Sequence, residues 1–507
     1  MRLGRRVAGT VLLLATMALW IGSAGAADVP AADCHVAGIR NGVLCGSVDR
    51  PLDPARPQGT RIAVRYVVVP AMARRKLADP VFLLAGGPGQ SAVALAASTM
   101  ALFARLNNRR DIVFVDQRGT GGSAPLQCQD PEQETLAEQA DADRQYRLTM
   151  ACKAELLKLP YIRAERDLGL FTTWIAVQDL DAVRAALGAA RIDLVGGSYG
   201  TRVALEYQRQ FPAAVRRSVI DGVAPPDMAL PASFSTDNQA AFDALAAACA
   251  AEPACARRHP DLSGRFAALL KTLPRQVTAA QALTGRDETF VLTSDMVLGA
   301  VRGALYSPAL AAALPEAIDE AARGRLEGIV GLGSTFLAKK SVRLAAGMHL
   351  SVVCAEDVPR LGRAADVPGV DFGTQFAAFY ERLCSGWPRG TVPEAFYRIT
   401  PSRTPVLLLS GGLDPATPPR HGVRVARALG PSARHVVVAN AGHGVMAVGC
   451  MRDVVFRFID AAEDADALAV DASCAAKVPR PPAFQPVGSA LAASAASAPL
   501  AASGATR

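Results

Sequence analysis

With 507 residues the chain exceeds the usual size of a single domain, so either one large core with an insertion or two domains is expected. Half of the residues are hydrophobic and a fifth are charged, which excludes a largely disordered protein. The formal net charge is +8, but the basic residues are scattered rather than clustered, which argues against a nucleic-acid-binding surface.

The first 26 residues have the pattern of a signal peptide. Arg2, Arg5 and Arg6 precede an apolar run over 7–21, and small residues up to Ala26 offer a cleavage site. The run is too short and too close to the terminus to favour a membrane span, although an uncleaved anchor is the alternative. We therefore expect an exported protein, periplasmic or secreted, with no stable membrane span after signal cleavage.

Ten cysteines also fit export to an oxidising compartment. Pairing between sequence neighbours is a hypothesis, because sequence alone does not fix the connectivity of ten cysteines. The neighbouring pairs are Cys34 with Cys45, Cys128 with Cys152, Cys249 with Cys255, Cys354 with Cys384, and Cys450 with Cys474. No C-x-x-C motif and no His/Cys cluster with zinc spacing occurs, so we expect no metal site.

Short apolar strands alternate with helical patterns along the first half of the chain. Residues 27–60 are expected to be irregular, and strands are predicted at 61–69, 81–84, 111–115 and 217–221. A helix is predicted from Thr172 or Thr173 to Leu187, where Gly188 ends it. This succession of strand, Gly-rich loop, helix and strand is typical of a parallel α/β sheet.

The alternation stops after residue 226. Alanine- and leucine-rich helical patterns occur at 238–250, 262–273 and 294–305, and the segment is too long for a loop. Strands return at 405–409 and 435–438. The predicted organisation is a signal peptide (1–26), a core in two parts (27–226 and 404–476) separated by a mainly helical cap (227–403), and a low-complexity tail (477–507).

Ser198 lies in the pattern Gly196-x-Ser198-x-Gly200, between an apolar run over 191–195 and a helical pattern that Pro212 ends. G-x-S-x-G places a serine on a strained turn between a strand and a helix, where glycines two residues away leave room for the backbone. An ordinary Gly-rich turn is the alternative. The nucleophile hypothesis therefore requires a base and an acid elsewhere in the chain.

Asp414 and His443 each follow one of the returning strands. Chemistry in open α/β sheets gathers at the carboxyl ends of strands, and the order Ser, Asp, His is that of an α/β-hydrolase triad. His443 would take the proton of Ser198, while Asp414 would fix its tautomer. A turn-opening aspartate and a structural histidine are the alternatives for each residue alone. Their occurrence together at the correct strand ends favours the triad.

An oxyanion hole requires two backbone N–H groups. One is expected from Tyr199, the residue after the nucleophile, and the other from the loop after the strand at 81–84. Gly87 is our candidate and Gly86 its competitor; a plain tight turn is the alternative. This mechanism needs no cofactor.

Taken together, the motifs resemble those of the proline iminopeptidases and the related secreted tripeptidyl aminopeptidases, over most of residues 35–475. The matching motifs are Gly86-Gly87-Pro88-Gly89, Asp116-Gln117-Arg118-Gly119-x-Gly121-x-Ser123, Gly196-Gly197-Ser198-Tyr199-Gly200, Asp414-Pro415-x-Thr417-Pro418 and Gly442-His443-Gly444. Many iminopeptidases have histidine before the first motif, where this chain has Ala85, so substrate preference is less safely carried over.

The resemblance implies an α/β-hydrolase fold and exopeptidase action on peptides with free N-termini, with a cap acid that binds the substrate ammonium. Glu356 is our candidate, because residues 351–357 resemble the cysteine-plus-acid segment of the secreted branch. Asp357 is the alternative, and Glu356 could instead be a solvated or bracing acid. Asp116 and Arg118 are interpreted as bracing residues.

The sequence leaves two rival functions open. An esterase could use the same triad on small esters, because acyl transfer does not reveal its leaving group. A non-catalytic binding protein on a hydrolase scaffold is disfavoured by the intact set of Ser198, Asp414 and His443.

Overall fold

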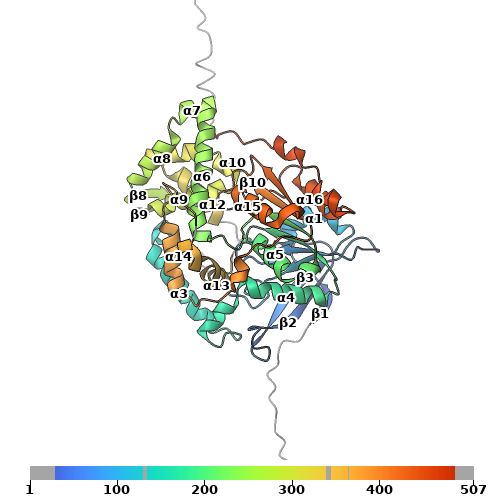
Figure 1. Ribbon diagram of the computed structural model, residues 1–507. Coiled ribbons are helices and arrows are strands. Elements are labelled where there is room, and N and C mark those ends of the chain that lie inside the picture. Colours follow the sequence, from blue (N-terminus) through green and yellow to red (C-terminus); the bar gives the residue numbers. More distant parts are fainter. Residues whose placement is uncertain (1–28, 130–133, 338–343, 364, 486–507) are drawn as a thin grey trace, which may run out of the picture.

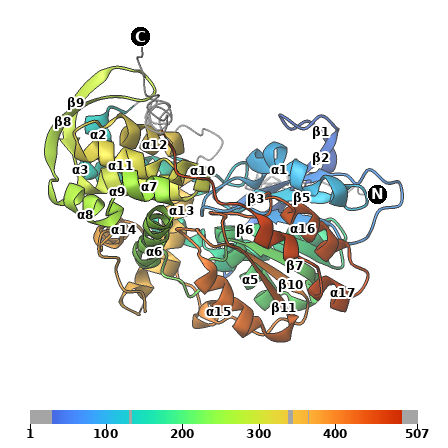
Figure 2. The same cartoon turned by 90° about the horizontal axis from the view of Figure 1, so that it is seen from above.

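The computed structural model describes residues 29–129, 134–337, 344–363 and 365–485. The predicted signal peptide and most of the predicted tail lie outside these residues. A sheet-containing core and a mainly helical cap lie side by side (Figures 1 and 2). Within the described residues, no helix has the length and apolar character needed to cross a membrane.

The core is built on a nine-stranded sheet in the order β1-β2-β3-β5-β4-β6-β7-β10-β11. β1, β2 and β3 pair antiparallel, as do β3 and β5, and every further pair is parallel. The inner parallel strands are buried on both faces, which explains their apolar runs, whereas β11 at the edge of the sheet includes exposed residues. The strands are Val29–Cys34, Val43–Pro51, Arg61–Val69, Val81–Leu84, Ile112–Val115, Ile192–Gly197, Val215–Asp221, Val406–Gly411 and Ala433–Val438, for β1 to β7, β10 and β11.

Helices cover both faces of this sheet. Alternate residues of β4 point to opposite sides: Val81 and Leu83 pack with the helices of one face, Phe82 and Leu84 with those of the other. One layer holds α1 (Ala92–Asn107), α16 (Met451–Asp460) and α17 (Asp464–Leu468); the other holds α4 (Thr173–Ala186), α5 (Tyr199–Gln210) and α15 (Pro419–Leu429). The predicted α/β-hydrolase architecture is therefore confirmed.

The expectation of an irregular segment over 27–60 is wrong. This segment forms β1 and β2, which extend the sheet beyond β3, and β2 pairs with β3 from Leu44 to Pro51. Pairing of β2 with β3, a strand outside the segment, stabilises a sequence whose polar residues resemble a loop. Cys34 and Cys45 bridge the same two strands.

The cap contains most of the helices between the two parts of the core: α6 (Leu230–Ala251), α7 (Pro253–Arg258), α8 (Leu262–Lys271), α9 (Ser294–Leu305), α10 (Pro308–Ala311), α11 (Leu314–Ala322), α12 (Glu327–Leu337), α13 (Ala346–Val352), and α14 (Gln375–Ser385). A π-helical segment, Val353–Asp357, follows α13. The helical prediction omits an antiparallel hairpin, β8 (Arg275–Ala280) with β9 (Asp287–Leu292). Two earlier helices, α2 (Leu136–Ala140) and α3 (Ala142–Leu156), lie on the cap side, with Leu136 buried in the core of the cap.

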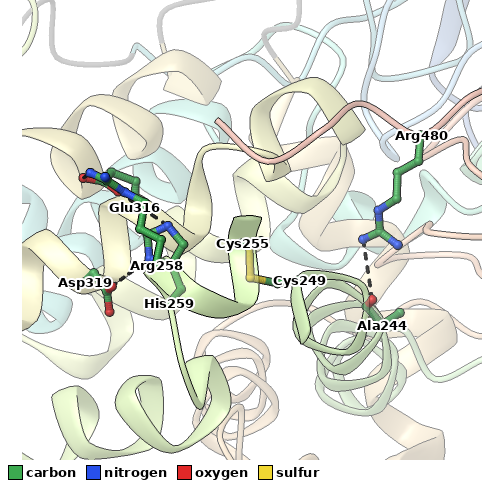
Figure 3. Close-up of a disulfide and its surroundings, with 8 residues drawn as sticks. All are labelled: Ala244, Cys249, Cys255, Arg258, His259, Glu316, Asp319 and Arg480. Carbon is green, nitrogen blue, oxygen red and sulfur yellow. Dashed lines mark hydrogen bonds and ion pairs between the residues drawn. A yellow bond between two sulfur atoms is a disulfide. The ribbon is translucent and has the colours of Figure 1, made fainter. Parts of the chain in front are cut away.

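All ten cysteines form disulfides, and each bond joins the two sequence neighbours named above. Figure 3 shows the bond that ties α6 to α7, Cys249–Cys255, beside an ion pair of Arg258 with Glu316. In the same view Arg480 donates to the carbonyl of Ala244 on α6. The segment after the last core helix therefore crosses from the core to the cap.

Candidate active site

Ser198 sits between β6 and α5 with φ 54° and ψ −124°, a backbone conformation that is strained for any residue with a Cβ. The flanking glycines have a steric role. A Cβ at Gly196 would come within 2.4 Å of the carbonyl oxygen of Gly200, and one at Gly200 within 2.1 Å of that of Leu84. The turn can form only with glycine at both positions.

The structure brings Asp414 and His443 into direct contact. Asp414 follows β10 and His443 follows β11, and His443 Nδ1 lies 2.8 Å from Asp414 Oδ2. Burial opposes ionisation of Asp414. The adjacent imidazole and the hydrogen bonds that the carboxylate accepts nevertheless hold the pKa of Asp414 below its usual value. The same carboxylate raises the pKa of His443 in spite of burial, so this pair favours the imidazolium that a general base forms.

Thr417 is a third member of this group that the sequence analysis quoted only as part of a motif. Its Oγ1 donates to Asp414 Oδ2 at 2.8 Å and lies 3.1 Å from His443 Nδ1. The backbone N–H of Thr417 donates to Asp414 Oδ1. The spacing of Asp414 and Thr417 can indicate a local turn held by side-chain hydrogen bonds, whereas the contact of Thr417 with His443 depends on the fold.

Gly86, the competitor of Gly87 for the second oxyanion N–H, lies against the serine. A Cβ at Gly86 would come within 3.3 Å of the Cβ of Ser198, so the Gly-Gly-Pro-Gly loop packs directly on the turn. Gly87 has φ +112°, and a Cβ there would approach the nitrogen of Gly89 to 2.7 Å. Tyr199 is the first residue of α5, so its N–H lies at a helix N-terminus, where backbone donors favour negative charge.

Comparison with known proteins places these motifs in a family. A model described as "TAP-like protein" matches residues 369–474, and one described as "alpha/beta hydrolase fold" matches residues 79–254. The chain is an α/β hydrolase, and its C-terminal part is similar to TAP-like proteins. It is accordingly a serine hydrolase, with serine peptidases among its relatives.

Two relatives illustrate the range of similarity. Serine protease Hip1 of Mycobacterium tuberculosis is 26% identical over 77% of this chain and 80% of that protein. Tripeptidyl aminopeptidase of Streptomyces coelicolor is 34% identical over 36% of each chain. A crystal structure of proline iminopeptidase from Mycobacterium smegmatis is 19% identical, with a TM-score of 0.36 over 84% of this chain and all of that one, a similarity too low to support an argument.

Glu356, the candidate acid for the substrate ammonium, lies at the junction of the cap with the core. Its side chain is fully buried, and its carboxylate accepts hydrogen bonds from the backbone and hydroxyl of Thr173, at 2.7 and 2.9 Å, and from Arg202 at 3.3 Å. Asp357 is equally buried and also binds Arg202. Both acids join the cap to α4 and α5, because their partners come from the core.

Asp116 and Arg118, which the sequence led us to interpret as bracing residues, bind other parts of the core. Asp116 accepts from Ser91 Oγ and from the N–H groups of Val93 and Gly122, and thereby joins the start of α1 to the loop after β5. Arg118 is buried against Asp179 and donates to three backbone carbonyls. Among the described residues, no group of three or more His, Cys, Asp or Glu side chains is placed to hold a metal ion.

Proposed function

We propose that this serine hydrolase is an exported aminopeptidase that cleaves peptides near their free N-termini through an acyl-enzyme on Ser198. The observation that carries the proposal is the 2.8 Å contact of His443 with Asp414 at two strand ends beside the strained serine turn. Relatives named as a serine protease and a tripeptidyl aminopeptidase support a peptide substrate. The N-terminal sequence pattern and five disulfides support export.

In this mechanism the Oγ of Ser198 attacks the scissile carbonyl carbon while His443 takes its proton. Asp414 accepts the Nδ1–H of His443 and stabilises the imidazolium. The N–H groups of Tyr199 and Gly87 would hold the developing oxyanion. His443 then protonates the leaving amine, and water activated by the same imidazole hydrolyses the acyl-enzyme.

The test uses the mature protein with chromogenic tripeptidyl- and single-residue anilides and a p-nitrophenyl ester. Ser198→Ala should lower kcat by about 10⁴-fold or more on every substrate, with an unchanged thermal unfolding midpoint. Hydrolysis of the ester without any peptide anilide would make the protein an esterase instead. Near-wild-type turnover by Ser198→Ala, or no labelling of Ser198 by a fluorophosphonate, would remove the proposed nucleophile.

A further inference from the structure

The start of α13 in the cap packs on the oxyanion loop, which we define as residues 86–89. The N–H of Ala345, the residue before α13, donates to the carbonyl of Gly89 at 2.8 Å. A Cβ at Gly89 would come within 3.0 Å of the carbonyl oxygen of Ala345, and one at Gly87 within 3.1 Å of the side chain of Leu344. The cap and this loop of the core are therefore in van der Waals contact.

His349 makes a second contact between α13 and the loop. It lies one helical turn after Ala345, on the same face of α13. Its Nδ1 is 3.1 Å from the carbonyl oxygen of Pro88, and its Nε2 is 2.8 Å from the hydroxyl oxygen of Tyr380 on α14. One imidazole thus connects the oxyanion loop to two helices of the cap.

The partners of His349 determine which ring nitrogen carries the proton. A carbonyl oxygen only accepts, so the Nδ1–H of His349 must donate to Pro88. Burial lowers the pKa of His349, although the hydrogen bond to Pro88 opposes this, so the ring is neutral at neutral pH. Nε2 then accepts from the hydroxyl of Tyr380. The tautomer that donates to the loop is the one that Tyr380 stabilises.

The oxyanion loop depends on contacts from outside for its orientation. Gly87 and Gly89 have φ +112° and +109°, and without a Cβ their backbones are free to rotate. Pro88 has no N–H, so its backbone can be held by hydrogen bonding only through its carbonyl. An N–H that stabilises an oxyanion must point at it before the reaction begins. A donor to Pro88 therefore bears on the direction of the adjacent Gly87 N–H.

We propose that His349 is a positioning residue that holds the Gly87 N–H towards the oxyanion by donating from Nδ1 to the carbonyl of Pro88. The cap thereby completes the oxyanion hole of the core. The inference rests on the proposed function through the acyl-enzyme and the role of Gly87, and it applies to an ester substrate as well as to a peptide. The competing explanation is that His349 only joins α13 to α14 through Tyr380.

Two substitutions separate the contacts of His349. The amide nitrogen of Asn is as many bonds from Cα as Nδ1, so His349→Asn keeps the donor to Pro88 and loses Tyr380. The amide nitrogen of Gln matches Nε2 in the same way, so His349→Gln keeps Tyr380 and loses Pro88. His349→Gln should lower kcat by about 10- to 100-fold with little change in KM, whereas His349→Asn should retain most of the activity. A role confined to joining the helices predicts the reverse order.

Inhibition by phenylboronic acid provides a readout of the oxyanion hole itself. Its tetrahedral adduct with Ser198 places an oxygen where the oxyanion forms, so its Ki should rise in His349→Gln by about the factor by which kcat falls. His421 provides a matched control, because its Nε2 joins α15 of the core to Asp237 on α6 of the cap at 2.9 Å. His421→Gln should lower the thermal unfolding midpoint but leave kcat and Ki unchanged.

The variants are compared on p-nitrophenyl acetate and alanyl-alanyl-alanyl-p-nitroanilide. Wild-type kcat and Ki in His349→Gln would overturn the positioning role, and so would a greater loss in His349→Asn than in His349→Gln. An equal rise of Ki in His421→Gln would also overturn it, because any loss of contact between cap and core would then have the same effect. Hydrolysis of the ester alone would reject the aminopeptidase, while the comparison of the His349 variants on the ester would still decide this inference.

Discussion

Asp221 accepts the backbone N–H of Val445 with both carboxylate oxygens, at 2.7 and 3.0 Å. The same carboxylate accepts from the N–H of Met446, and its backbone carbonyl accepts the N–H of Ser198 at 2.8 Å. Val445 follows His443 by two residues. Asp221 at the end of β7 therefore anchors both the serine turn and the histidine loop.

Replacement of Asp221 tests this anchoring role. Asp221→Ala removes the acceptors of two backbone N–H groups, so the histidine loop should shift and kcat should fall by about 100-fold with a small change in KM. Asp221→Asn keeps one acceptor oxygen and should lose less. Steady-state kinetics with a near-UV circular dichroism spectrum check the result; kcat equal to that of the wild type in the alanine variant would contradict the anchoring role.

Thr417 supplies a second positioning test. Thr417→Val keeps the shape but removes the hydroxyl that donates to buried Asp414, so kcat should fall by about 10-fold or more while KM changes little. Thr417→Ser keeps the hydroxyl and should retain most of the activity. A loss of activity in Thr417→Ser with none in Thr417→Val would show that packing of the methyl group, rather than the hydrogen bond, is what matters.

The environment of His443 predicts the acid limb of the pH profile. Asp414 raises its pKa above 6.5, and the charge of Asp221 adds to this, although burial opposes it. Because only the neutral imidazole accepts the serine proton, kcat/KM should decline as pH falls through a midpoint above 6.5. The residual activity of Asp414→Asn should have its midpoint at lower pH. A wild-type midpoint at or below 6.5 would be inconsistent with this pair.

Glu356 should behave as a bracing residue. Glu356→Gln should lower the free energy of unfolding, since a buried partner of Arg202 is lost, without changing the ratio of rates on free and acetylated tripeptides. A collapse of that ratio would restore Glu356 as the ammonium site.

The same variant should alter how stability depends on pH. Burial raises the pKa of Glu356 to about 7, although Arg202 opposes this. The folded protein then binds this proton more tightly than the unfolded chain between about pH 4.5 and 7, so this residue's contribution to stability declines as pH rises through that window. The stability of Glu356→Gln does not decline for this reason. The difference in free energy of unfolding between the wild type and this variant should therefore be smaller at pH 8 than at pH 5. Urea unfolding at the two pH values measures it.

The local sequence was sufficient for the features that depend on short-range sterics and strand patterning. The strands at 61–69 and 81–84 have the predicted bounds, because alternating and fully apolar runs can be recognised without their pairing partners. The glycines around Ser198 are required by contacts within the turn and with the neighbouring strand end, which the motif already encodes. The fold class follows from these elements and their order.

Only the tertiary structure decided which polar groups meet. The carboxylate of Asp221 lies 224 residues from its partner Val445, and no local pattern signals that contact. Glu356 follows a cysteine as expected, yet packing of the cap on Thr173 and Arg202 buries it. The cap also places the end of α9 against His443, and long-range packing of this kind is set by the whole hydrophobic core rather than by any one segment.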